Sequence, residues 1–445
     1  MTKTFHIRTY GCQMNERDSE ALACMLRECG YRQVMAEEEA DILLFNTCSV
    51  REQAERKVFG KVGILKKLKR RRPDIIIGVI GCMAQNYGRK ILDELPHVDL
   101  VVGTDRMHLL PEILQDVCTG QRGQVHTEPG TEVLGKLRGH EPGRVSAFIS
   151  VMRGCNQFCT YCIVPYVRGR EKSRPLPDIV REVEEVVAQG AREIFLLGQN
   201  VTAYGLAELR DQGEYRPDVS PFADLLLAVN EVEGVERIRF TSPHPRFMNQ
   251  AFIESITTLP KVCESLHVPL QSGSDRILKA MRRGYTSEDF MACIQAIRER
   301  QPEFTFTTDV IVGFPGETPE DFEATRRVMD AAGFEMAYIF KYSPRSGTKA
   351  AEMADDVPRA LKEERNQILL QDLERRSAAG NDVYIGRTVE VLAEGPSKRN
   401  VERWAGRTRT NKVCIFPPAK SIQVGDLVQV HIERATPNSL FGEVL

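Results

Sequence analysis

The chain has little net charge, no long apolar run and a single tryptophan among its 445 residues. Its formal net charge of -2 and its isoelectric point near 6.5 exclude no class of partner, since a basic face can exist within a balanced total. No stretch of about eighteen apolar residues appears, and the N-terminus MTKTFHIRTY lacks the basic and then apolar order of a signal peptide. We therefore expect a cytoplasmic protein that does not contact a membrane.

A fourth cysteine is missing from the most distinctive segment, RGCNQFCTYCIVP. Cys155, Cys159 and Cys162 have the spacing C-x3-C-x2-C, and no other cysteine is near them in the sequence. Three thiolates on such a loop can ligate three irons of a [4Fe-4S] cluster and leave one iron open to a small molecule. A zinc site, which usually has four ligands, and a disulfide are the alternatives. Twelve cysteines in a reducing compartment favour ligands and buried thiols over a disulfide framework.

The N-terminal part, residues 1–118, alternates short apolar runs with helical patterns, which predicts a doubly wound α/β domain. The first three predicted strands each end at a cysteine: Cys12, Cys48 and Cys82. In a parallel sheet these ends lie on one edge, where such folds bind ligands. The pattern predicts a second three-cysteine cluster site. The alternative is that these are buried thiols, which is common for isolated cysteines.

A glycine-rich, polar segment at 119–145 is expected to link this domain to the next. Residues 146–376 contain six strand and helix units, which predicts an open (βα)6 partial barrel that admits a large substrate. Function is expected at the carboxyl ends of its strands, where glycine lets a ligand approach the backbone and side-chain amides bind polar groups. His244 and His267 lie close to prolines and are interpreted as structural. The candidate cofactor-binding residues at strand ends are Gly198, Gln199, Gln271 and Asp309.

Residues 377–445 change to short β runs separated by glycine and proline, which predicts a small β-barrel. The segment KRNVERWAGRTRTNK surrounds the only tryptophan with six basic residues and one acidic residue. Arginines beside an aromatic ring suit single-stranded or looped RNA, whereas a solvated hairpin is the alternative. The predicted RNA-binding residues are Lys398, Arg399, Arg403, Trp404, Arg407, Arg409 and Lys412.

Four segments resemble the methylthiotransferase family of radical S-adenosylmethionine enzymes. They are TYGCQMNERDSE, FNTCSVREQAE, GVIGCMAQ and RGCNQFCTYCIVPYVRGREKS, and the resemblance extends over essentially the whole chain. It implies a radical S-adenosylmethionine core and a TRAM domain at the C-terminus. It also implies S-adenosylmethionine bound to a cluster, with its amino group near the GQN segment from Gly198 and its adenine at the backbone of Tyr161. The two implied [4Fe-4S] clusters are held by Cys12, Cys48 and Cys82 and by Cys155, Cys159 and Cys162.

The resemblance further implies that a methylthio group is attached to C2 of N6-isopentenyladenosine immediately 3′ of the anticodon in tRNA. No acid or base side chain breaks that C–H bond at neutral pH, so a cofactor must supply the reactivity. The expected partners are the tRNA anticodon stem-loop and a reducing electron donor, and the expected state is a monomer. Gln13-Met14-Asn15 and the basic C-terminal segment disfavour a ribosomal-protein aspartate or threonylcarbamoyladenosine as the substrate. A non-catalytic iron-sulfur protein that binds RNA is the third alternative.

Overall fold

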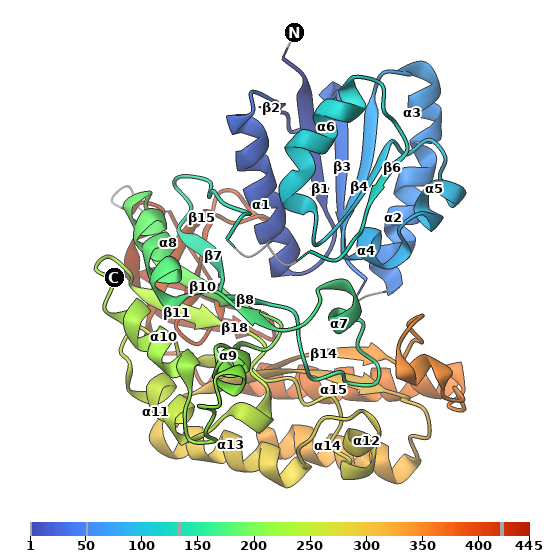
Figure 1. The fold of residues 1–445 in the computed structure, drawn as a ribbon. Coiled ribbons are helices and arrows are strands. Elements are labelled where there is room, and N and C mark those ends of the chain that lie inside the picture. The colour runs from blue at the N-terminus through green and yellow to red at the C-terminus, as the bar shows by residue number, and fades with distance from the viewer. Residues whose placement is uncertain (1, 50–51, 131–134, 419–421) are drawn as a thin grey trace.

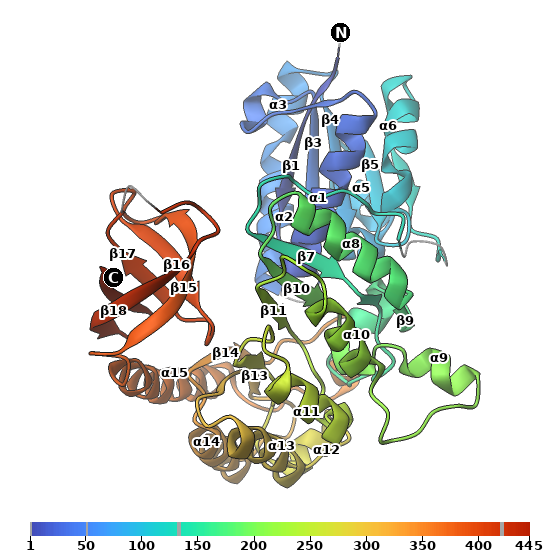
Figure 2. The same cartoon turned by 90° about the vertical axis from the view of Figure 1, so that its left-hand side faces the viewer.

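The computed structural model describes residues 2–49, 52–130, 135–418 and 422–445, which form three units (Figure 1). An N-terminal sheet with its helices, a central barrel-like core and a small C-terminal β-barrel follow one another along the chain. Figure 2 shows the C-terminal barrel beside the core. The predicted fold class is confirmed for all three units. Within these described ranges, no helix combines the length and the apolar character needed to span a membrane.

The N-terminal unit is a six-stranded parallel sheet in the order β2-β1-β3-β4-β5-β6. Alternate side chains of a strand point to opposite faces, so Ile42 and Leu44 pack with α1 and α6, whereas Leu43 and Phe45 pack with α2, α4 and α5. The elements are β1 Thr4–Thr9, α1 Gln13–Glu28, β2 Arg32–Gln33, β3 Ile42–Thr47, α2 Glu52–Ile64, α3 Lys66–Arg71, β4 Ile76–Gly81, α4 Cys82–Tyr87, α5 Lys90–Glu94, β5 Leu100–Gly103, α6 Leu110–Cys118 and β6 Gln124–His126.

The central unit contains six parallel strands in two hydrogen-bonded groups, β11-β10-β7 and β12-β13-β14. A parallel bridge between Thr241 and His267 joins the groups, and no pairing among the described residues joins β14 to β7. The barrel is therefore open on one side, as predicted. Its elements are β7 Ser146–Ser150, β8 Met152–Arg153, α7 Val164–Val167, β9 Lys172–Ser173, α8 Leu176–Ala188, β10 Glu193–Leu197, α9 Leu206–Asp211, α10 Pro221–Asn230, β11 Arg237–Phe240, α11 Gln250–Thr258, β12 Ser265–His267, α12 Asp275–Ala280, α13 Ser287–Arg300, β13 Thr305–Val312, α14 Pro319–Ala332, β14 Met336–Lys341 and α15 Arg359–Asp382.

The C-terminal unit is a closed barrel with the strand order β15-β16-β17-β19-β18. Its strands are β15 Thr388–Pro396, β16 Trp404–Thr408, β17 Val413–Phe416, β18 Leu427–Thr436 and β19 Ser439–Val444. Buried apolar side chains from all five strands except β16 fill its interior, and Trp404 of β16 packs against them.

The turn between β16 and β17 joins the barrel to the amino ends of the core strands. Arg239 of β11 donates to the carbonyls of Thr408 at 2.7 Å and Arg409 at 2.9 Å. Arg237, which is fully buried, donates to the carbonyl of Arg407 at 2.6 Å. The C-terminal barrel is thus fixed at the end of the core opposite to the carboxyl ends of its strands.

Two segments differ from the sequence-based boundaries. The expected linker at 119–145 contains β6, which pairs with β5 at the edge of the N-terminal sheet, and residues 131–134 of this segment lie outside the described residues. Helix α15 continues past residue 376 to Asp382, so it connects the core to the C-terminal barrel without a break.

Candidate functional site

The three N-terminal cysteines follow neighbouring strands of the parallel sheet. Cys12 follows β1, Cys48 follows β3 and Cys82 follows β4, and these strands are adjacent because the short β2 lies at the sheet edge. Their ends are level, since Thr9 pairs with Asn46 and Thr47 pairs with Gly81. The topology therefore brings the three thiols to one edge, as the strand pattern predicts.

Two buried asparagines organise this edge. Asn15 donates to the Asn46 side chain at 3.0 Å and to the Thr47 carbonyl at 3.1 Å, and it accepts from the Cys12 thiol at 3.3 Å. Gly81 has φ of +93°, and a Cβ there would lie 2.4 Å from the Asn46 amide oxygen, so only glycine fits. Sequence reasoning missed both asparagines, although each stands within the GCQMN and FNTC segments.

The loop with Cys155, Cys159 and Cys162 follows β8 at the carboxyl end of the first core strand. Its middle is fastened by Thr160, whose N–H donates to Met281 and whose carbonyl accepts from Ala350, at 3.0 and 2.8 Å. Burial, together with the proximity of Cys159, raises the pKa of Cys155 and the pKa of Cys162 to about 12. Crowded thiols of this kind become thiolate ligands only when positive charge is brought among them.

A buried arginine supplies positive charge on one side of this loop. Arg283 donates to the Cys159 sulfur at 3.4 Å and to the Tyr285 hydroxyl at 3.0 Å. Its burial opposes the cation, but Tyr285, Tyr161 and Cys159 together raise the pKa of Arg283 well above its usual value. Hydrogen bonds to ligand sulfurs tune the reduction potential of a cluster. The sequence offered no signal for Arg283, because its burial depends on contacts between distant segments.

The two cysteine sets are joined directly. Cys82 packs against Ile163 and Val167, which follow Cys162 in the chain. From the end of α7, Arg168 donates to Asp18 at 2.9 Å. Its burial opposes the cation, but Cys82, Asp18 and Cys12 raise the pKa of Arg168 well above its usual value. A side chain of the radical loop therefore reaches the edge of the N-terminal sheet.

The predicted cofactor residues lie around the same loop. Gln199 accepts a hydrogen bond from the Gly154 N–H at 2.6 Å, beside Cys155. Gly198 has no room for a side chain, since a Cβ would lie 2.6 Å from Met152 Cγ. The ring of Tyr161 packs into the apolar cluster around Phe314 and Tyr342, which leaves its main chain for a ligand.

Gln271 and Asp309 lie together at the carboxyl end of the second strand group. Gln271 has φ of +71°, and its N–H donates to the carbonyl of Asp309 at 2.8 Å. The Asp309 carboxylate lies 3.3 Å from His267 Nε2, while His267 Nδ1 contacts the Thr307 hydroxyl at 2.8 Å. His267, interpreted as structural from the sequence, is therefore in contact with a predicted cofactor residue.

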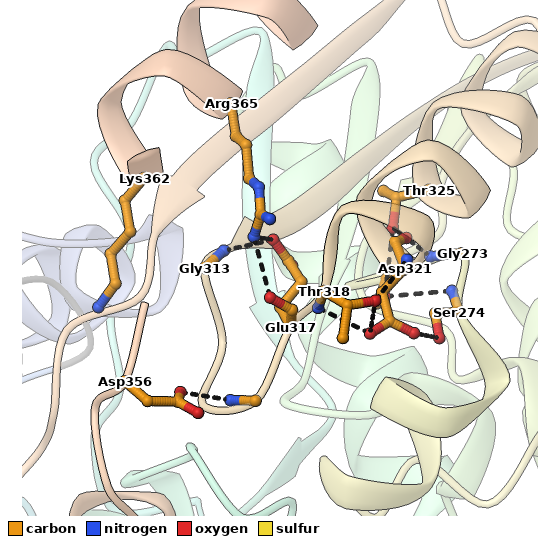
Figure 3. Close-up of polar contacts among 12 residues, drawn as sticks. Gly273, Ser274, Gly313, Glu317, Thr318, Asp321, Thr325, Asp356, Lys362 and Arg365 are labelled. Carbon is orange, nitrogen blue, oxygen red and sulfur yellow. Dashed lines mark hydrogen bonds and ion pairs between the residues drawn. The ribbon is translucent and has the colours of Figure 1, made fainter. Parts of the chain in front are cut away.

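The loop that follows β13 is held by helix α15 through a buried ion pair. Figure 3 shows Arg365 donating to Glu317 at 2.5 Å, while the same carboxylate accepts from the Gly313 N–H at 2.9 Å. Both side chains of the pair are at most 3% exposed. The loop also accepts support from Asp356, which takes a hydrogen bond from the Gly316 N–H at 2.7 Å. The helix that leads to the C-terminal barrel thus fixes a loop at the cofactor edge.

We expect Arg365→Ala to lower the free energy of unfolding by about 3–5 kcal/mol, because it leaves the Glu317 carboxylate buried without its cation. Arg359→Ala on the same helix is the control, since the Arg359 side chain is 90% exposed and its ion pair with Glu363 is on the surface. Chemical denaturation of both variants measures the difference. Equal stability of the two variants would contradict the assignment of the buried pair as a structural fastening.

The predicted RNA-binding residues divide into two groups. Lys398, Arg399 and Arg403 are exposed. Arg409 forms an ion pair with Glu264 at 2.7 Å, and Lys412 forms one with Glu335 at 2.5 Å. The structure therefore uses the last two side chains to join the barrel to the core, because the β16–β17 turn inserts between the amino ends of the core strands. The other two predicted residues are partly buried, with Trp404 in the barrel wall and Arg407 3.2 Å from Glu394.

A three-cysteine loop at the carboxyl edge of an open (βα)6 barrel, followed by a small β-barrel, defines a radical S-adenosylmethionine enzyme with an added nucleic-acid-binding module. Three family descriptions match the chain: "Uncharacterized protein family UPF0004" over residues 4–103, "Radical SAM superfamily" over 149–329 and "TRAM domain" over 382–445. The chain belongs to the family of tRNA-2-methylthio-N(6)-dimethylallyladenosine synthases, as its curated relatives show.

Two of these relatives cover nearly the whole chain. The synthase of Opitutus terrae is 47% identical over 472 residues, which span 99% of this chain and 97% of that protein. The synthase of Moorella thermoacetica is 46% identical over 446 residues, which span 100% of this chain and 98% of that protein. Among solved structures, the radical S-adenosylmethionine methyltransferase TsrM from Kitasatospora setae has a TM-score of 0.59 at 16% identity. It covers 79% of this chain and 77% of its own, and this likeness concerns the fold alone.

Proposed function

We propose that this enzyme attaches a methylthio group to C2 of the N6-isopentenylated adenosine immediately 3′ of the anticodon in tRNA. The observation that carries the proposal is the direct contact between the two cysteine sets through Cys82, Ile163 and Arg168. Sulfur insertion at an unactivated carbon needs a radical source and a sulfur donor held next to each other. The substrate follows from the names of the relatives, which cover the whole chain at nearly half identity.

The residues present fit two [4Fe-4S] clusters. In the described residues, no three His, Cys, Asp or Glu side chains converge closely enough to bind one metal ion. The thiolates of a cubane bind different irons and stand farther apart than the ligands of one ion, so both sets suit a cluster better than zinc. Cys12, Cys48 and Cys82 would hold one cluster, and Cys155, Cys159 and Cys162 the other. When bound, these clusters and S-adenosylmethionine supply the electron, the radical chemistry and the sulfur.

The chain's own residues hold and orient these groups. Arg283 places a cation against the Cys159 sulfur, which favours its thiolate form. Asn15 fixes the strand ends around Cys12 and Cys48 through Asn46 and the Thr47 carbonyl. Tyr161 through its main chain, together with Gly198, Gln199, Gln271 and Asp309, would position S-adenosylmethionine across the strand ends. The open side of the barrel would admit the adenosine after it leaves its base stack.

We further propose the working context of the enzyme. Both cysteine sets lie in one chain, so a monomer contains the complete site. The enzyme would act in the cytoplasm, on the anticodon stem-loop of tRNA, and would receive electrons from a low-potential reducing donor.

The substrate assignment is tested with anaerobically reconstituted protein and anticodon stem-loop RNA with and without the isopentenyl group. Mass spectrometry of the digested nucleosides is expected to show the methylthio product only from the isopentenylated RNA. Product from threonylcarbamoyladenosine or from a ribosomal-protein aspartate would contradict the proposal. Iron analysis is expected to give about eight irons per chain, since each cubane contains four. About four irons would contradict a second cluster.

The exposed basic residues of the C-terminal barrel are expected to contact RNA phosphates. Replacing Lys398, Arg399 and Arg403 by alanine should raise the Michaelis constant for tRNA. It should also reduce the slope of log affinity against log salt by about 2, because each phosphate contact to single-stranded RNA contributes about 0.7. The slope is measured by titrating tRNA binding over a range of salt concentrations.

A matched control changes three basic residues elsewhere. Lys66, Lys67 and Arg70 are exposed on α3, which precedes the amino end of β4, far from the cysteine edge. Their replacement by alanine is expected to leave the salt slope unchanged. An equal loss of slope in both triple variants would mean that the C-terminal barrel has no specific role in RNA binding.

A further inference from the structure

Glu171 carries a buried carboxylate that the described protein does not satisfy. The residue is 5% exposed, and neither Oε1 nor Oε2 has a hydrogen-bond partner among the described residues. Buried polar atoms in folded proteins nearly always have partners, and a buried charge without one is strongly unfavourable. Burial accordingly raises the pKa of Glu171 to about 7. The carboxylate therefore awaits a donor that comes from outside the chain.

This carboxylate lies beside the loop of the second cysteine set. Strands β8 and β9 pair Arg153 with Lys172, so the antiparallel register continues to Gly154 opposite Glu171. The N–H of Gly154 is bonded to Gln199, a predicted cofactor residue. The N–H of Glu171 itself donates to the Asn156 side chain at 3.2 Å, inside the cysteine loop. Backbone contacts thus fix Glu171 next to Cys155.

The neighbouring charged residues have other partners. The Arg210 guanidinium, on α9, favours the ionised form of Glu171, but it lies over the Tyr215 ring, 4.5 Å from the ring centre. Glu208, also on α9, accepts from the Ser173 N–H at 2.9 Å. Cys155 faces the same carboxylate from the loop, and Glu171 adds to the raised pKa of its thiol. Within the described chain, this leaves a single negative group next to the loop without a bonded cation.

We propose that the Glu171 carboxylate binds the cationic part of S-adenosylmethionine, which carries a sulfonium and an ammonium group. This inference rests on the proposed function, because it places that cofactor at the Cys155 loop. A carboxylate attracts a small cation and repels RNA phosphates. The contact with the loop of Gly154 and Gln199 also favours the cofactor over the target base. Glu171 is therefore a cofactor-binding residue that strand ends alone did not indicate.

The test is equilibrium binding of S-adenosylmethionine to cluster-loaded protein under anaerobic, non-reducing conditions. Glu171→Gln keeps the shape and removes the charge, and we expect its dissociation constant to rise about tenfold to a hundredfold, the range for losing a charged hydrogen bond. Glu171→Asp should bind with intermediate affinity. Glu184→Gln, on the exposed face of α8, is the matched control and should bind like the wild type. Iron content and melting temperature of Glu171→Gln should equal those of the wild type.

Several outcomes would overturn the assignment. An unchanged dissociation constant in Glu171→Gln would do so, as would a loss confined to tRNA affinity, which would mean that the carboxylate faces the substrate. A fall in iron content or melting temperature would instead assign Glu171 to support of the loop. If the wild type with a full complement of iron binds no S-adenosylmethionine, the proposed function and this inference both fail. Binding by the wild type with equal binding by the variant removes only the inference.

Discussion

Replacing Cys155 by alanine is expected to abolish the cleavage of S-adenosylmethionine and, with it, all methylthiolation. The three thiols of this loop are the only protein ligands proposed for its cluster, and removing one leaves two ligands for a four-iron core. The loop is fastened at Thr160 by backbone bonds to Met281 and Ala350, so the variant should keep its fold. The measurement is 5′-deoxyadenosine formed after anaerobic reduction, determined by liquid chromatography.

The control for this variant is Cys118→Ala. Cys118 is exposed at the end of α6 and belongs to neither cysteine set. It should form 5′-deoxyadenosine at the rate of the wild type. Substantial cleavage by Cys155→Ala would show that the loop does not hold the reducing cluster, and the proposed mechanism would lose its radical source.

Replacing Cys48 by alanine is expected to separate the two activities. Cys48 follows β3 in the N-terminal sheet, whereas the radical loop belongs to the core, so the loop should keep its cluster. Formation of 5′-deoxyadenosine should therefore continue while methylthiolated RNA falls to background. Cys82 is a less suitable choice for this experiment, because it packs against Ile163 and Val167 and its loss would disturb the loop directly.

The Cys48→Ala experiment has two informative failures. Loss of both activities would mean that the N-terminal cysteines support the fold of the radical site. Retention of both would mean that they are buried thiols with no part in sulfur transfer. Iron analysis of the variant gives an independent reading, with a decrease of about four irons per chain expected for loss of one cubane.

The contact between the two cysteine sets gives these predictions their physical basis. Arg168 belongs to the radical loop segment, yet its charge is balanced by Asp18 and by the thiols at the N-terminal edge. Arg153, which precedes the loop, pairs with Asp105 at 3.1 Å in the N-terminal unit. Two buried ion pairs therefore connect the units at the site, and their geometry keeps the sulfur donor and the radical source at a constant separation.

Strand patterns predicted most of the fold, and their failures have a common cause. The long apolar strands such as β3 and β13 are visible because their side chains must be buried on one or both faces. The two-residue β2 and three-residue β6 carry no such pattern, and only pairing with a neighbouring strand makes them strands. The same holds for β16, which reads as a polar basic segment but pairs with β15 and β17.

The candidate site shows the same division. The positions of the cysteines at strand ends could be predicted, since the strands and the parallel topology follow from the chain order. The supporting arginines could not, because an arginine is ordinarily expected at the surface. Arg283, Arg168 and Arg237 are buried because carbonyls, thiols and carboxylates from distant segments converge on them.

The amino-acid sequence by itself determined the two cysteine sets, the alternation that builds two α/β units, and the final β-barrel, because thiol spacing and side-chain periodicity are local properties of the chain. Only the tertiary structure decided that the sets touch, that Arg409 and Lys412 serve the interface between barrel and core, and that Glu171 is buried without a donor. Those features depend on burial and on partners from remote segments, and a charged side chain acquires its energetic meaning only when the dielectric and the neighbours around it are known.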